Sequence, residues 1–161
     1  MSRLDSFIRR LTAQRDCLGL AAQLIVDIPG PVLELGLGNG RTYDHLRELF
    51  PAREIFAFDR QLNAHALAIP DPAHLILGEF SATLAPLLAR LAARPALAHA
   101  DFGGGEPGRV VGIATWLGQA LVGRMAPGGI VASDQALPGT PWEALPLPSG
   151  IAAERYFLYR C

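Results

Sequence analysis

The sequence predicts an α/β fold, a doubly wound and mostly parallel sheet with helices on both faces, an N-terminal helical segment and a C-terminal edge strand. From residue 31 onward, short apolar runs that end at glycines or acids alternate with helical segments, which is typical of parallel sheets. The 161 residues are 50% apolar and 18% charged, which suits a single globular domain. We expect residues 1–29 to form the N-terminal helix or helices, 31–134 the ligand-binding core, and 135–161 a loop and a terminal strand.

The N-terminal segment has apolar residues at every third or fourth position through residues 4–28. This spacing predicts one amphipathic helix, or two helices joined near Gly19. Gln14 and Arg15 interrupt the apolar pattern at positions where it should continue. This part of the face either meets a polar surface or a ligand, or is a solvated break between two helices.

Five apolar runs predict the strands of the core, at residues 32–35, 54–58, 74–77, 96–100 and 130–133. Periodic segments predict the helices between them, at residues 41–50, 81–93 and 109–125. Residues 135–149 contain four prolines and predict a loop, and residues 155–159 predict a last strand at the sheet edge. Ligands of doubly wound folds bind beyond the carboxyl ends of the strands.

All 14 basic residues are arginines, and the chain has no lysine. This composition excludes Schiff-base enzymes, phosphate-loop nucleotidases and protein kinases, which need a lysine. The net charge of −1 is spread along the chain, which gives no clear nucleic-acid signal. We expect no membrane segment, no signal peptide and two free thiols, at Cys17 and Cys161, and therefore a cytoplasmic protein.

A glycine-rich turn joins the first predicted strand to a helix, with glycines at positions 36, 38 and 40. Such glycines let the backbone approach a ligand, and the helix N-terminus offers N–H donors to a carboxylate or phosphate. The dinucleotide fingerprint G-x-G-x-x-G needs a third glycine at position 41, which is Arg41. A dinucleotide-binding oxidoreductase is therefore an alternative that this position disfavours.

Four features follow one another in order along the chain. Glu34 precedes the glycine turn, Asp59 follows the second predicted strand, residues 78–80 read Gly-Glu-Phe, and residues 125–130 read Met-Ala-Pro-Gly-Gly-Ile. In this order they resemble the motifs of class I S-adenosylmethionine-dependent methyltransferases, of the small single-domain type without a separate substrate domain.

The resemblance implies S-adenosylmethionine as the cofactor and methyl transfer to a small-molecule acceptor. It implies that Asp59 holds the ribose hydroxyls, that Glu79 accepts from the adenine amine, and that Phe80 offers a backbone donor and an apolar contact to the ring. The implied cofactor-binding residues are Glu34, Gly36, Gly38, Asn39, Gly40, Arg41, Thr42, Asp59, Gly78, Glu79, Phe80 and Asp101.

The fourth predicted strand ends at Asp101, which the resemblance places nearest the methyl group. Asp101 and His45, which lies on the helix after the glycine turn, are the candidate catalytic bases. The two prolines of the amine and base methylase motif are missing after Asp101, so methylation of a base amine is disfavoured. Cys17 and Cys161 lie at the chain ends, which disfavours a cysteine-dependent pyrimidine methylase.

We predict no metal site. The alternative is a magnesium site formed by Asp101, Asp134 and Gln135, by resemblance to catechol-type O-methyltransferases. Glutamine replaces the asparagine of those enzymes, and their lysine base is missing. We expect His99 to be a hydrogen-bonded core residue, and residues 103–105 to form either a lid or a flexible turn.

A second alternative is that the protein binds S-adenosylmethionine without catalysing a reaction, because no substrate-recognition insertion is visible in the sequence. The acceptor pocket must come from the helix near Gln14 and Arg15, from residues 102–108 and 135–149, or from another subunit. The high apolar content predicts a homo-oligomer.

Overall fold

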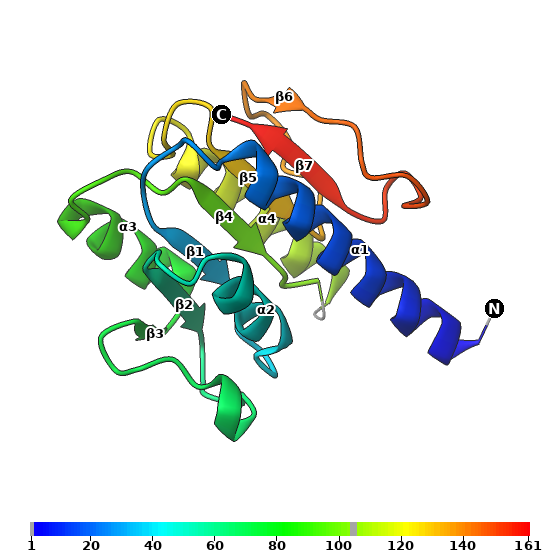
Figure 1. Cartoon of the computed structure of the whole chain (residues 1–161), viewed down its shortest axis with the longest axis horizontal. Helices are drawn as coiled ribbons and strands as arrows, with labels where there is room; N and C mark the ends of the chain where they lie inside the picture. The colour runs from blue at the N-terminus through cyan, green and yellow to red at the C-terminus, as the bar shows by residue number, and fades with distance from the viewer. Residues whose placement is uncertain (1, 104–105) are drawn as a thin grey trace.

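Seven strands form one sheet in the order β3-β2-β1-β4-β5-β7-β6 in the computed structural model of the chain, which describes residues 2–103 and 106–161 (Figure 1). Strands β1 to β5 pair in parallel, whereas β7 pairs antiparallel with β5 and with β6. The fold is therefore the mostly parallel α/β sheet that the sequence predicts. The strands are β1 (Val32–Leu35), β2 (Ile55–Asp59), β3 (Leu75–Leu77), β4 (Leu97–Ala100), β5 (Ile130–Ser133), β6 (Glu143–Ala144) and β7 (Phe157–Arg160).

Helices cover both faces of the sheet, as predicted. On one face, buried side chains of α1 (Arg3–Leu24) and α2 (Arg41–Leu49) pack on alternate strand residues such as Val32 and Leu97. On the other face, α3 (Phe80–Arg90) and α4 (Pro107–Leu121) pack on the intervening residues. A single 3-10 turn, η1 (Ala66–Ala68), lies between β2 and β3.

The N-terminal segment is one continuous helix, which confirms the first of the two predicted alternatives. The Ser2 hydroxyl accepts from the Asp5 amide, and the Asp5 carboxylate accepts from the Ser2 amide, so α1 begins with a capping box. Gly19 lies within the helix and causes no break. Gln14 interrupts the apolar pattern but is only 4% exposed, so the interruption is a buried polar residue and not a solvated break between two helices.

The C-terminal region departs from the prediction in one respect. The proline-rich segment, which we predicted as a loop alone, contains β6, and this short strand pairs with β7. Trp142 packs on Tyr159 with their ring centroids 6.1 Å apart, and Glu143 lies 3.2 Å from Arg160. These contacts with β7 hold β6 in place, so β6 and not β7 is the outermost strand.

Arg53 joins elements at the opposite end of the sheet from the carboxyl ends of the strands. Its guanidinium donates to the carbonyl oxygens of Ile28 at 2.7 Å, Gly30 at 3.0 Å and Ile25 at 2.8 Å. These carbonyls lie in the connection from α1 to β1, so one side chain satisfies the backbone where the chain turns into the sheet. Among the described residues, no helix has the length and apolar character needed to cross a membrane.

Candidate functional site

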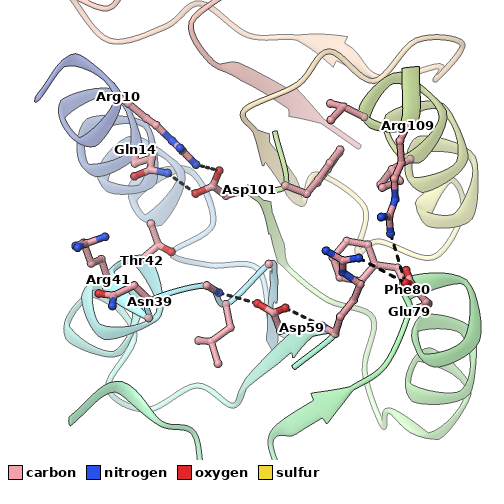
Figure 2. A pocket seen from close by; sticks show the side chains of 18 of the residues that line it. Arg10, Gln14, Asn39, Arg41, Thr42, Asp59, Glu79, Phe80, Asp101 and Arg109 are labelled. Atoms are coloured by element: carbon pink, nitrogen blue, oxygen red, sulfur yellow. Dashed lines mark hydrogen bonds and ion pairs between the residues drawn. The ribbon is translucent and has the colours of Figure 1, made fainter. Parts of the chain in front are cut away.

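A cavity of about 720 Å³ opens at the carboxyl ends of β1, β2 and β4, where ligands of this fold class bind (Figure 2). Its walls come from α1, the glycine turn, the start of α3 and the start of α4. The structure brings ten of the predicted cofactor-binding residues to this cavity: Gly36, Gly38, Asn39, Gly40, Arg41, Thr42, Asp59, Glu79, Phe80 and Asp101.

The glycine turn lies against β4 and leaves room for a ligand. Gly36 has a φ of +104°, and a Cβ there would lie 2.2 Å from the carbonyl oxygen of Asp101. Gly38 has no atom within 4 Å of its own Cβ position, so the space beside it is open. Gly40 is the N-cap residue of α2 in the left-handed conformation, with no side-chain cap. The positive end of α2 therefore faces the cavity through backbone alone.

Asp59 is the last residue of β2, and its carboxylate holds the glycine turn in position. One carboxylate oxygen accepts from the Gly38 amide at 2.8 Å, and the other accepts from the Arg60 amide at 2.7 Å. A carboxylate has about four lone-pair sites, so Asp59 keeps acceptor capacity toward the cavity. This is the chemistry needed to hold two neighbouring hydroxyl groups.

Glu79 and Phe80 form the far side of the cavity, at the start of α3 (Figure 2). Glu79 is the N-cap residue of α3, but its side chain makes no cap hydrogen bond. Its carboxylate instead lies 3.4 Å from Arg109 and 4.0 Å from Arg60. Phe80 meets Phe102 edge to face, with centroids 6.4 Å apart. An aromatic wall beside an acceptor suits a flat, nitrogen-rich ring.

Asp101 follows β4 and faces the cavity beneath α1 (Figure 2). It forms an ion pair with Arg10, and its second oxygen accepts from the Gln14 amide at 2.6 Å. The contact of Gln14 confirms that this face of α1 meets a polar surface. Arg15, which we grouped with Gln14, points outward and pairs with Asp16.

Asp134 follows β5 and fixes the loop after Asp101. Its carboxylate accepts from the Gly103 amide at 2.9 Å and from the Phe102 amide at 3.3 Å. Burial, and then the nearby charge of Asp101, raise the pKa of Asp134 to about 6. Of the predicted lid at residues 103–105, positions 104 and 105 lie outside the described residues.

Asp101, Asp134 and Gln135, the residues of the alternative magnesium site, lie together at the ends of β4 and β5, because the Asp134 side chain is hydrogen-bonded to those of Asp101 and Gln135. Arg10 pairs with Asp101, and the Asp134 oxygens also accept from backbone amides. The magnesium site stays an alternative prediction.

Three predicted site residues lie outside the cavity lining. Glu34 is completely buried; it accepts from the Thr42 hydroxyl and pairs with His99, so it acts on the cavity only through Thr42. Gly78 has a φ of +138° and makes the turn from β3 into α3. The ring of His45 lies 3.7 Å from Glu48, and its buried Nε2 has no hydrogen-bond partner among the described residues.

His99 is a hydrogen-bonded core residue, as predicted. Its Nδ1 pairs with Glu34 and its Nε2 meets the Tyr156 hydroxyl. All three side chains are at most 1% exposed, so this network is buried in the core and reaches the cavity only through the hydrogen bond of Glu34 with Thr42.

The sequence predicted that the N-terminal helix near Gln14 contributes to the pocket, but it did not single out the other residues of that wall. Phe7, Arg10 and Leu11 share the cavity-facing side of α1 with Gln14, and their spacing was the available signal. The wall from α4 was not predicted. Arg109 and Trp116 line the cavity from α4. The segment 135–149, from which we expected acceptor contacts, does not line the cavity in the described part of the chain, because it packs beside β7.

Comparison with known proteins matches residues 1–161 to a family described as S-adenosyl-L-methionine methyltransferase. The crystal structure of an S-adenosyl-L-methionine methyl transferase from Silicibacter pomeroyi DSS-3 is 41% identical, with a TM-score of 0.92, over 99% of this chain and 98% of that chain. A search of curated proteins found no match.

Two more distant structures share the fold. The O-methyltransferase NovP is 14% identical, with a TM-score of 0.61, over 95% of this chain and 79% of that chain. DesVI from Streptomyces venezuelae is 15% identical, with a TM-score of 0.51, over 91% of this chain and 64% of that chain. Both similarities cover more than nine-tenths of this chain.

Proposed function

Because the chain belongs to the S-adenosyl-L-methionine methyltransferase family, we propose that it transfers the methyl group of S-adenosylmethionine to a small-molecule acceptor bound beside Asp101. The observation that carries this proposal is the position of Asp101, which faces the cavity next to the glycine turn. The cavity volume of about 720 Å³ lies in the range of small-molecule sites.

The residues present fit the cofactor. Open space beside Gly38 and the bare N-terminus of α2 suit the amino-acid end, and the Asp59 carboxylate suits the ribose hydroxyls. Glu79 would accept from the adenine amine, and Phe80 would pack on the ring. When bound, S-adenosylmethionine supplies an electrophilic methyl group on a positively charged sulfur.

Asp101 orients the acceptor and takes its proton. Asp101 would take the hydrogen of the acceptor atom as that atom bonds to the methyl group. The methyl–sulfur bond would break in the same step, so the positive charge of the sulfur is lost and S-adenosylhomocysteine leaves. Arg10 and Gln14 both donate to Asp101, which fixes the direction of its carboxylate. His45 does not line the cavity, so Asp101 alone takes the role of base in this proposal.

A calorimetric and kinetic comparison tests the proposal. The wild-type protein should bind S-adenosylhomocysteine, and Asp101→Asn should lower turnover by about 10²- to 10⁴-fold, far more than it weakens binding. Asp44→Asn is the matched control, because Asp44 lies on α2 and pairs with Arg47 outside the cavity.

Phenols, amines, thiols and carboxylates form the acceptor panel. Tight binding without turnover of any acceptor would favour a non-catalytic cofactor-binding module. Binding of a nicotinamide dinucleotide, with no heat from S-adenosylhomocysteine, would overturn the proposal. We also propose that the protein forms a homo-oligomer, because its apolar content is high for a small monomer. We propose a cytoplasmic location because Cys17 and Cys161 are free thiols.

A further inference from the structure

A series of hydrogen-bonded side chains runs from the cavity into the core and ends beside β7. The Thr42 hydroxyl, which lines the cavity, donates to one oxygen of Glu34 (Figure 2). The other oxygen of Glu34 pairs with Nδ1 of His99, and Nε2 of His99 meets the Tyr156 hydroxyl. We call these four side chains the polar network. Glu34, His99 and Tyr156 are at most 1% exposed.

The sheet brings the polar network together. Glu34 on β1 and His99 on β4 are register partners, so their side chains lie on the same face of the sheet. The residue of β5 at the same register position is Ala132, whose small side chain leaves room for the Tyr156 ring. The rings of Tyr156 and His99 are stacked, with their centroids 6.1 Å apart. The network therefore forms only when β4, β5 and β7 are all in place.

The stability of the fold does not by itself require this network. Apolar side chains of similar volume in the place of a buried ion pair often give an equally stable or more stable protein. Among the described residues, the side chains of Glu34, His99 and Tyr156 form hydrogen bonds only with one another and with Thr42. The role of the network is therefore at the cavity, where the Thr42 hydroxyl meets a ligand.

The network determines what Thr42 offers to that ligand. A threonine hydroxyl can rotate, so it can donate or accept a hydrogen bond. An ionised carboxylate only accepts, so the hydrogen of the Thr42 hydroxyl points at Glu34. The Thr42 oxygen keeps its lone pairs for the cavity and accepts from an N–H group. The backbone amides at the start of α2 offer the opposite, because they donate.

We propose that Tyr156 and His99 are positioning residues for the cofactor, because through Glu34 they hold the Thr42 oxygen as an acceptor for the ammonium group of S-adenosylmethionine. This inference rests on the proposed function, in which the amino-acid end of the cofactor binds at the start of α2. There the carboxylate meets N–H donors and the ammonium group meets Thr42. The two charged groups of the amino-acid end thus have separate partners.

Titration calorimetry with two ligands tests the proposal. S-adenosylhomocysteine carries the ammonium group, whereas its desamino analogue keeps the carboxylate and lacks only that group. Tyr156→Phe removes the last hydroxyl of the network and should weaken binding of S-adenosylhomocysteine by about 2- to 30-fold, with binding of the desamino analogue unchanged. Tyr159→Phe is the matched control, because the Tyr159 hydroxyl accepts from the Leu137 amide at 3.1 Å, away from the network. It should change neither affinity.

Circular dichroism and thermal melting establish that the variants are folded. Equal losses of affinity for the two ligands in Tyr156→Phe would indicate a general structural effect and would overturn the proposal. No loss for either ligand would do the same. A wild-type protein that binds neither ligand would overturn the proposed function, and this inference with it.

A double-mutant cycle tests whether Tyr156 acts through Thr42. Thr42→Val removes the acceptor and should weaken binding of S-adenosylhomocysteine at least as much as Tyr156→Phe does. Tyr156→Phe added to Thr42→Val should cause little further loss, because coupled residues are not additive. Additive losses would contradict action through Thr42.

Nuclear magnetic resonance of the wild-type protein gives a readout that needs no variant to fold. Of the four histidines, His99 alone has no solvent exposure, so its ring N–H signals are identified by their slow exchange with water. These signals should shift when S-adenosylhomocysteine binds and stay in place with the desamino analogue. Identical shifts with both ligands would overturn the proposal.

Discussion

Glu34 and His99 lie side by side on β1 and β4 and form an ion pair with no solvent exposure. The second oxygen of Glu34 accepts from Thr42 at the cavity, and the second ring nitrogen of His99 meets the Tyr156 hydroxyl just before β7. Four polar side chains therefore connect the cavity to the C-terminal strand. Because each charge is buried, its partner is required for stability as well as for position.

The ion pair makes the stability of the protein depend on pH. Burial lowers the pKa of His99, but the charge of Glu34 and its hydrogen bond raise it more, so the pKa lies above its ordinary value of 6.5. The stabilisation is complete below the pKa of the unfolded chain and is lost as the pH rises through the raised folded value. Urea unfolding at pH 6 to 9 should show a falling free energy of unfolding.

Two variants test whether the Glu34–His99 pair causes this pH dependence. His99→Gln should show a flatter pH dependence across the same range. Glu34→Gln removes the partner of a buried cation and should cost about 3–5 kcal/mol. A wild-type free energy of unfolding that rises with pH in this range would contradict the expected protonation of His99.

Asp59→Ala should weaken binding of S-adenosylhomocysteine by about tenfold or more. The change removes the carboxylate that holds Gly38 and faces the cavity, and hydrogen bonds to a charged group are worth about 1.5–3 kcal/mol. Titration calorimetry measures the effect, with Asp44→Ala on α2 as the control of equal size. Equal affinities of the two variants would remove Asp59 from the cofactor site.

Two glycine substitutions should have opposite effects on stability. Gly36→Ala forces a Cβ to within 2.2 Å of the Asp101 carbonyl at a φ of +104°, and should destabilise the fold by several kcal/mol, of order 3. Gly19→Ala meets no atom within 4 Å inside α1 and should stabilise the protein by about 0.5–1 kcal/mol. Thermal denaturation of both variants checks the pair, and a neutral Gly36→Ala would mean that the turn can move away from β4.

Arg53→Lys should destabilise the protein by about 1–3 kcal/mol, although the charge is kept. The planar guanidinium reaches three carbonyls at once, whereas an ammonium group cannot reproduce this fork. Arg3→Lys on the exposed start of α1 is the control and should change the free energy of unfolding by less than about 0.5 kcal/mol. Urea denaturation of both proteins measures the difference.

The buried strands could be predicted from the sequence because their apolar runs are uninterrupted. The bounds of β1 and β5 agree with the prediction residue for residue. The helix predicted at 109–125 ends at Leu121, because Gly123 turns the chain at a φ of +71° while the apolar spacing continues. The strand β6 gives no periodic signal, since two residues pair only because β7 is already in place.

The candidate site also has a part that could be predicted from the sequence and a part that could not. The glycine turn, Asp59 and Glu79 follow strands directly in the sequence, so local motifs were enough to bring them to one edge. Arg10 meets Asp101 across 91 positions of sequence, and that contact depends on how α1 packs on the sheet. Glu34 belongs to the motif but lies beneath the cavity, which the sequence spacing alone does not distinguish.

The walls of the cavity come from five separate segments of the chain: α1, the glycine turn, the end of β2, the start of α3 and the segment from β4 to α4. A ligand that touches all of them must be released before any of them unfolds, so occupancy raises the melting temperature by mass action. At one hundred times its dissociation constant, a ligand adds about 2.7 kcal/mol, or roughly 5–10 °C for a chain of this size. Melting curves of the S-adenosylhomocysteine complex, recorded across a chemical library, can therefore identify the acceptor before any assay of methyl transfer exists.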